Sequence, residues 1–157
     1  MSQEKEAVDS FKKAKDYVYR LLRFRMRSEN EIVQRLKSKN FDENTIKNTV
    51  SYFKDIGLID DFKFCQLWFE ERLNKPFGFL RIVKELRQKG VSQQIIDQVF
   101  TEKKNSYKEE DLICKIIQKR IKDKSSLLSI KEKRKLYTYL IQRGFSVDAV
   151  SEVINSL

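Results

Sequence analysis

Residues 36–50 (LKSKNFDENTIKNTV), 86–100 (LRQKGVSQQIIDQVF) and 140–154 (LIQRGFSVDAVSEVI) share one pattern. In each stretch a leucine is followed by a basic residue three positions later, then by Asn or Gly, an apolar residue, and Asp or Ser. A left-handed Gly or Asn commonly ends a helix, and Asp and Ser commonly begin one. Each stretch therefore predicts the end of one helix, a short turn and the start of the next.

A further helix is predicted before each of these pairs, because apolar residues there follow the i, i+3, i+4 spacing of a buried helical face. The matched sets begin at Ala14, Phe64 and Ile113. We expect helices near residues 4–26, 28–39 and 42–56, then 60–74, 78–89 and 92–104, then 107–123, 130–143 and 146–156. Ser28 and Glu31 form a capping-box pattern for the second of them.

The sequence thus predicts an all-α fold of three tandem three-helix repeats, at residues 1–58, 59–105 and 106–157. A unit of about 50 residues has little core of its own. We therefore expect neighbouring units to bury one another's apolar faces in an elongated, curved array. Such an array more often offers a binding surface than an enclosed active site.

Composition favours a basic protein that meets polyanions. The 157 residues carry 33 Lys and Arg against 23 Asp and Glu, a formal charge of +10. A charge of this size speeds association with nucleic acid or an acidic protein surface. No apolar run approaches the roughly 20 residues that span a bilayer, and the N-terminal stretch has no signal-peptide core. We expect a cytoplasmic monomer that contacts no membrane.

Catalytic chemistry has little support. Histidine is absent, which excludes Ser–His and Cys–His nucleophilic sites and removes the commonest zinc ligand. Cys65 and Cys114 lie in apolar helical stretches and are expected to be buried. The acidic pair Asp60 and Asp61 is better explained by helix capping than by a metal, and no phosphate-binding glycine loop occurs. We expect no catalytic residue, no metal and no cofactor.

Rows of cations mark several predicted helices. Arg20 and Arg23 share one face of the first helix with Lys13 and Arg27. Arg25 falls towards the apolar side, so we expect it to be partly buried and held in place, or to lie past the point where the helix bends. Any single row is more often a solvated face, but several rows on one array favour a phosphate-binding surface. Arg81 is equally placed to pair with Glu85, its i+4 neighbour. The further rows are Arg81 with Lys84, Lys115 with Lys119 and Lys122, and Lys131 with Lys135.

The aromatic residues give little sign of base recognition. Single-strand binders stack bases on exposed rings. Most large rings here fall on predicted core faces, namely Tyr17, Phe53, Phe64, Trp68 and Phe100. We therefore expect contact with the nucleic-acid backbone rather than readout of bases.

Two motifs make the chain recognisable. Residues 57–65 (GLIDDFKFC) run into Trp68 and Arg72 and continue through Gly78 and Arg81. Upstream, residues 25–32 (RMRSENEI) precede Leu36. Together these motifs closely resemble those of the RecX family, and the resemblance covers nearly the whole chain.

The resemblance implies a non-enzymatic regulator that lies along the groove of the RecA–single-stranded DNA filament. Such a protein restrains ATP hydrolysis, strand exchange and filament growth. The family-signature cations are then candidates for contact with RecA or DNA: Arg25, Arg27, Arg72, Arg81, Lys84 and Lys89. For Arg25 and Arg72, an ion pair between helices is an equally good interpretation.

Three other interpretations of the sequence remain open. The first is a general helical nucleic-acid-binding protein without a recombinase partner. The second is a metal-dependent nuclease, which would cleave DNA with magnesium. The third is a protein–protein adaptor with incidental charge, whose binding would barely change with salt, whereas phosphate contacts weaken steeply.

Overall fold

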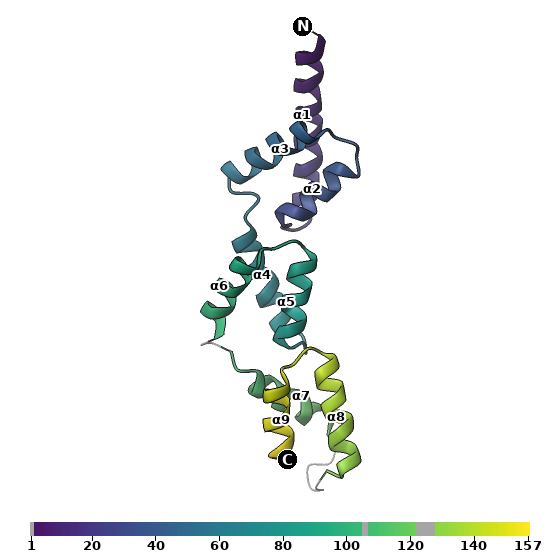
Figure 1. Cartoon of the computed structure of the whole chain (residues 1–157), viewed down its shortest axis with the longest axis vertical. Coiled ribbons are helices and arrows are strands. Elements are labelled where there is room, and N and C mark those ends of the chain that lie inside the picture. The colour runs from purple at the N-terminus through teal and green to yellow at the C-terminus, as the bar shows by residue number, and fades with distance from the viewer. Residues whose placement is uncertain (1, 105–106, 122–127) are drawn as a thin grey trace.

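The computed structural model describes residues 2–104, 107–121 and 128–157. Within these ranges every regular element is a helix. The bounds are α1 (Ser2–Leu22), α2 (Glu29–Lys37), α3 (Glu43–Asp55), α4 (Asp61–Leu73), α5 (Phe79–Gln88), α6 (Gln93–Lys104), α7 (Glu109–Arg120), α8 (Ile130–Gln142) and α9 (Val147–Asn155). They form repeat 1 (α1–α3), repeat 2 (α4–α6) and repeat 3 (α7–α9), which follow one another along the axis of an elongated molecule (Figure 1). The predicted all-α repeat fold is confirmed.

Each repeat has a core of its own. Phe53 and Leu36 are fully buried in repeat 1, Phe69 and Leu86 lie in the core of repeat 2, and Phe145 lies in that of repeat 3. The third helix of each repeat packs on both of the other helices and so encloses their apolar faces. The expectation that neighbouring units bury one another's faces is therefore wrong. The contacts between units are limited: Met26 of the α1–α2 loop packs against the core of repeat 2, and the Tyr107 ring lies edge-on to Phe79, with 4.8 Å between the ring centres.

The predicted turns and caps are confirmed. Asn40, Gly90 and Gly144 have φ values of 58°, 78° and 82°, so each takes the left-handed conformation that stops a helix. Ser28 and Glu31 form the expected capping box at the start of α2. The residues that begin and end the helices thus determine where the chain turns.

Two helices are shorter than predicted. Helix α1 ends at Leu22, so Arg23, Arg25 and Arg27 lie in the following loop and do not share a helical face with Arg20. Arg27 Nε donates to the Leu21 carbonyl at 3.4 Å, which satisfies an acceptor that the helix end leaves free. Helix α7 ends at Arg120.

One cysteine differs from its predicted environment. Cys65 is buried, as expected, but Cys114 is exposed. The buried face of α7 is made by Ile113, Ile116 and Ile117, and a residue directly after Ile113 is turned by about 100° from it. No helix in the described part of the chain is long and apolar enough to cross a membrane.

Candidate functional site

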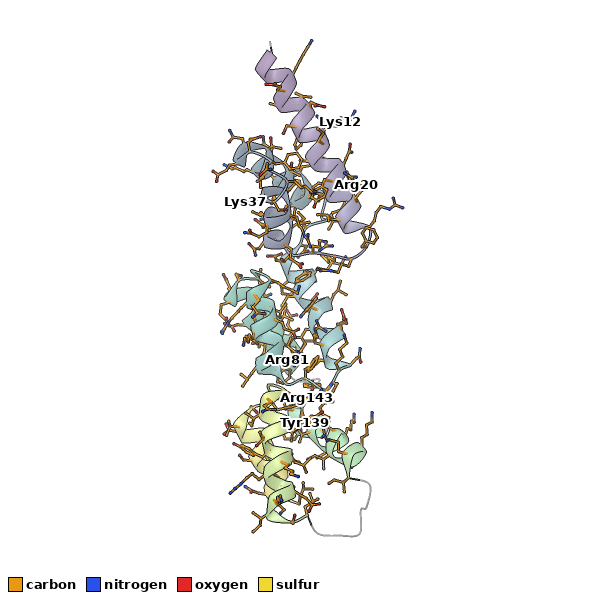
Figure 2. All side chains as sticks on the ribbon, turned by 90° about the vertical axis from the view of Figure 1, so that its right-hand side faces the viewer. Lys12, Arg20, Lys37, Arg81, Tyr139 and Arg143 are labelled. Carbon is orange, nitrogen blue, oxygen red and sulfur yellow. The ribbon has the colours of Figure 1, made fainter. Side chains whose placement is uncertain are left out.

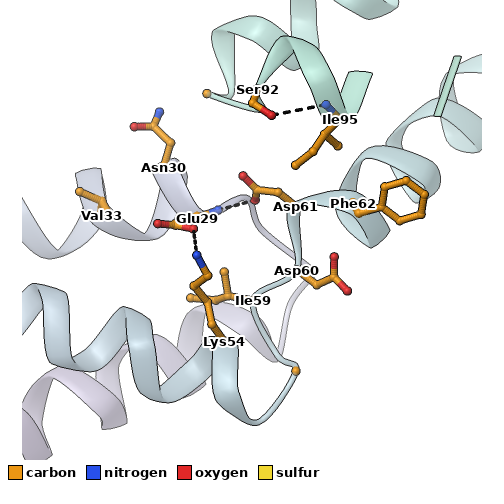
Figure 3. Close-up of a pocket in the computed structure, with 12 residues that line it drawn as sticks. Glu29, Asn30, Val33, Lys54, Ile59, Asp60, Asp61, Phe62, Ser92 and Ile95 are labelled. Carbon is orange, nitrogen blue, oxygen red and sulfur yellow. Dashed lines mark hydrogen bonds and ion pairs between the residues drawn. The ribbon is translucent and has the colours of Figure 1, made fainter. Parts of the chain in front are cut away.

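The contact between repeats 1 and 2 is made by the start of α2. The Ser28 hydroxyl donates to the Lys89 carbonyl at 2.6 Å, and the Glu29 amide donates to Asp61 Oδ1 at 2.7 Å (Figure 3). The first amides of a helix have no partner within it, and a carboxylate is the acceptor that the helix dipole favours. The start of α4 therefore satisfies the start of α2 and fixes how the two repeats meet.

The contact between repeats 2 and 3 uses equivalent residues. The Gly78 amide donates to the Arg143 carbonyl at 3.0 Å, and the Phe79 amide donates to Glu109 Oε1 at 2.8 Å. Glu109 is buried, and its second oxygen accepts from the Ser146 amide at 3.1 Å. At both junctions, the start of one repeat's second helix contacts two parts of the next repeat: its first helix, and the turn between its second and third helices. The second helices are thereby brought into line.

A row of cations, carboxylates and rings runs across the first junction. Arg25 holds Glu31 with two hydrogen bonds, at 2.7 and 3.1 Å, and Lys89 Nζ lies 3.1 Å from the same carboxylate. Burial raises the pKa of Glu31, but the Arg25 and Lys89 hydrogen bonds outweigh it and bring the pKa to about 2. Lys89 Nζ also lies 4.2 Å from the centre of the Trp68 ring. Repeats 1 and 2 are therefore joined by charge as well as by backbone contacts.

The row continues through repeat 2. The Arg72 guanidinium lies 4.3 Å from the Trp68 ring centre, and its Nε lies 2.7 Å from Glu85 Oε2 without the geometry of a hydrogen bond. Arg81 Nε donates to Glu85 Oε1 at 3.2 Å, as its i+4 spacing predicts. The Arg81 guanidinium also covers the Phe77 ring at 3.9 Å. Glu85 thus holds two arginines that each lie on an aromatic ring.

Repeat 3 extends the row. The Arg143 guanidinium lies 5.8 Å from the centre of the Phe77 ring and 4.6 Å from the centre of the Tyr139 ring. The Arg120 guanidinium also contacts Tyr139, at 3.8 Å from the ring centre. Figure 2 shows Arg81, Arg143 and Tyr139 close together where repeats 2 and 3 meet. We call the whole set the cationic strip: Arg25, Arg72, Arg81, Lys89, Arg120 and Arg143, with Glu31, Glu85, Trp68, Phe77 and Tyr139. Cations outnumber carboxylates in it, although Glu71 borders Arg72 at 4.0 Å.

The structure separates the family-signature cations into two kinds. The side chains of Arg25 and Arg81 remain 41% and 43% exposed, and the Lys84 side chain is exposed as well. Those of Arg72 and Lys89 are 18% and 20% exposed, because both are enclosed by carboxylates and the Trp68 ring. The side chains of the first group are therefore more accessible than those of the second.

Arg27 belongs to neither kind. It is half-buried, and burial, followed by the charge of Arg25, lowers the pKa of its guanidinium.

The other predicted rows are exposed. Arg20 lies in the last turn of α1, and Arg23 follows the end of that helix. Lys115 and Lys119 lie on α7. Lys122 falls outside the described residues. Lys131 and Lys135 are exposed on α8 and precede Tyr139 and Arg143 of the strip at the same four-residue spacing. Because residues four apart lie on one side of a helix, these two lysines prolong the strip along repeat 3.

Sequence reasoning missed Arg120, Arg143, Phe77 and Tyr139 as members of the site. One signal was available, since Arg143 stands in repeat 3 where Lys89 stands in repeat 2. For the rings the signal was the i+4 spacing of Phe77 to Arg81 and of Tyr139 to Arg143. The contacts of Tyr139 with Arg120 and of Phe77 with Arg143 join different helices and repeats, and spacing does not predict them.

Each junction also has a groove. The first has a volume of about 680 Å³, with Glu29, Lys54 and Asp61 in its lining, and Figure 3 shows Lys54 reaching the Glu29 carboxylate at 2.8 Å. The second, about 940 Å³, lies beside Glu109. Asp60 accepts from the Lys63 amide at 2.9 Å and so caps α4, as predicted. Among the described residues, no three acidic or cysteine side chains are grouped to hold a metal ion.

These features define a class of protein: a tandem array of three-helix units whose cations and aromatic rings form a strip across all three repeats. Family models for the first, second and third three-helix domains of RecX match residues 14–53, 60–99 and 108–154. The chain belongs to the RecX family, and the resemblance read from the sequence is confirmed.

Named relatives agree with this assignment. The chain is 33% identical to the regulatory protein RecX of Clostridium tetani, over 95% of this chain and 69% of the relative. It is 32% identical to that of Chlorobium phaeobacteroides, over 93% and 94% of the two chains. The fold is similar to that of the RecX crystal structure from Lactobacillus salivarius, with a TM-score of 0.84, 20% identity and coverage of 96% and 97%.

Proposed function

We propose that this protein binds the RecA–single-stranded DNA filament along its length and inhibits ATP hydrolysis, strand exchange and filament growth. It acts as a monomer by occupying a surface, without catalysis. Membership of a family of regulatory proteins supports the regulatory role. The elongated arrangement of the repeats suits a partner that itself extends along an axis (Figure 1).

The observation that carries the proposal is the continuity of the cationic strip across both junctions. Its cations come from all three repeats, and carboxylates and rings hold them in place. Phosphates spaced along a strand are the complementary ligand, and each contact releases counterions. Several linked contacts add avidity that one repeat alone lacks. We assign Arg81, Lys84, Lys131 and Lys135 to ligand contact, and Arg72 and Lys89 to holding the strip in shape.

The decisive experiment titrates the protein into RecA that is hydrolysing ATP on single-stranded DNA. Inhibition at or below stoichiometric amounts is the expected result. A pull-down that compares RecA filaments with bare single-stranded DNA separates a filament regulator from a general nucleic-acid-binding protein. Unchanged ATP turnover at low ionic strength, with no preference for filaments, would rule the proposal out.

The double substitution Arg81→Ala with Lys84→Ala is expected to weaken filament binding about tenfold, as loss of two phosphate contacts requires. The fold should survive, because the Arg81 side chain is 43% exposed, exposed ion pairs contribute little stability, and Glu85 keeps its contact with Arg72. Binding of the double variant and the unchanged protein is measured by anisotropy on labelled filaments. The matched control combines Lys12→Ala with Lys47→Ala, which removes two exposed cations of α1 and α3 outside the strip. Equal losses for the two variants would contradict the assignment.

Salt provides an independent prediction. Binding of the unchanged protein should fall steeply as salt rises from about 50 to 200 mM, and the double variant should show a slope in log K against log salt reduced by about 1 to 2. The same titration is run with Lys12→Ala and Lys47→Ala combined, which loses the same two positive charges outside the strip. A flat salt response would instead favour a protein–protein adaptor whose charge plays no part.

A further inference from the structure

Phe24 is the most exposed of the large apolar side chains that the structure describes, at 85% of its surface. It lies in the α1–α2 loop, between Arg23 and Arg25. Keeping a phenyl ring in water forgoes the stabilisation that burial would bring. A ring held out in this way is suited to a ligand that covers it.

The loop holds the ring in place by fixing its neighbours. The Arg25 guanidinium donates to the Met26 carbonyl at 3.0 Å and to both oxygens of Glu31. The Met26 side chain packs against the core of repeat 2, and Arg27 donates to the Leu21 carbonyl. With the following residues directed into the protein, Phe24 faces solvent from an ordered backbone. Such pre-organisation reduces the conformational entropy that is lost on binding.

The charge around Phe24 is of one sign. Residues 19–28 contain four arginines and no carboxylate. Glu31, which faces this loop, is already held by Arg25 and Lys89. Arg23 is exposed, and Arg25 is the first cation of the cationic strip. A ligand that follows the strip therefore passes beside the ring.

An exposed ring among cations has the chemistry of single-strand binding, in which bases stack on aromatic faces while cations hold the phosphates. We propose that Phe24 stacks on an unpaired nucleobase of the strand that the strip binds. This inference rests on the proposed function, since it takes the polyanion on the strip to be single-stranded DNA. It adds a contact to a base where the sequence predicted contacts to the backbone alone.

The test compares two oligonucleotides of equal length and charge: oligo(dT) and an abasic strand. Phe24→Ala should bind oligo(dT) about tenfold more weakly than the unchanged protein, and the abasic strand with less than a twofold change. Phe24→Trp should retain the preference for oligo(dT). Val147→Ala, which trims a 56% exposed side chain of α9, is the matched control and should change neither affinity.

The outcomes separate this inference from the proposed function. Equal weakening on both strands overturns stacking, and so does no weakening on either, or no binding of bare strands by the unchanged protein. A loss confined to RecA filaments also overturns it and assigns Phe24 to a protein contact. Inhibition of the RecA ATPase by the unchanged protein is measured separately. That result tests the proposed function, whatever the outcome for stacking by Phe24. Because Phe24 is exposed, circular dichroism should show Phe24→Ala folded.

Discussion

Replacing Gly78 with alanine should lower the free energy of unfolding by about 3 kcal/mol, the upper range for forcing atoms into a packed contact. A methyl group there would lie 2.2 Å from the Gly144 carbonyl oxygen and 2.2 Å from the Phe145 amide nitrogen. Both are backbone atoms and cannot turn aside as a side chain does. Repeat 3 must therefore move away from repeat 2, breaking the Gly78–Arg143 and Leu80–Gly144 hydrogen bonds.

Gly57→Ala is the matched control. Gly57 has a left-handed φ of 71° with open space around it, so its substitution adds backbone strain of about 1 kcal/mol and no clash. Gly78 has a φ of −81°, which any residue adopts, and its substitution adds the clash alone. Urea unfolding measures both, and hydrogen exchange at Phe79 and Leu80 reports undocking of repeat 3. A smaller effect for Gly78→Ala than for Gly57→Ala would refute this account of the junction.

Acidification should weaken the protein through Glu31. Its pKa is about 2 in the folded chain, below the ordinary glutamate value of 4.5, because Arg25 and Lys89 hold its charged form. A carboxyl group with a lowered folded pKa contributes stability that is present above its unfolded pKa and is lost as pH falls through its folded pKa. The contribution, about 3 kcal/mol, should therefore disappear between about pH 5 and pH 2.

Glu31→Gln isolates this contribution. The unfolding free energy of the variant should lack the decrease that Glu31 causes between about pH 5 and pH 2. Asp61 acts in the opposite direction, since burial raises its pKa and its protonation favours the folded state. Both proteins contain Asp61, so the difference between their unfolding free energies, measured across the pH range, reports on Glu31. Two curves that stay parallel from pH 5 to pH 2 would show that Arg25 and Lys89 do not hold the carboxylate as described.

The two junction predictions also bear on binding. The cationic strip is continuous only while the repeats keep their relative positions, because its contacts pass from Glu31 to Lys89 and from Arg143 to Phe77. A variant that undocks a repeat should therefore lose avidity even though every exposed cation is retained. This separates the shape of the surface from its charge.

Much of the architecture follows from the sequence alone. The three repeats, the turns at Asn40, Gly90 and Gly144, and the capping box at Ser28 were all predicted, because helix ends depend on residues a few positions apart. The excess of cations, too, is a property of composition. Such features need no knowledge of distant contacts.

Tertiary structure alone decided which charges and rings form the surface. Lys89 meets Glu31 across 58 residues of chain, and Arg143 meets the Pro76 carbonyl across 67. The same long-range packing encloses Arg72 and places Met26 against repeat 2, while Arg81 and Phe24 remain exposed. Helical periodicity specifies a face within one helix, but which faces meet depends on how separate helices pack, and neither spacing nor composition encodes that locally.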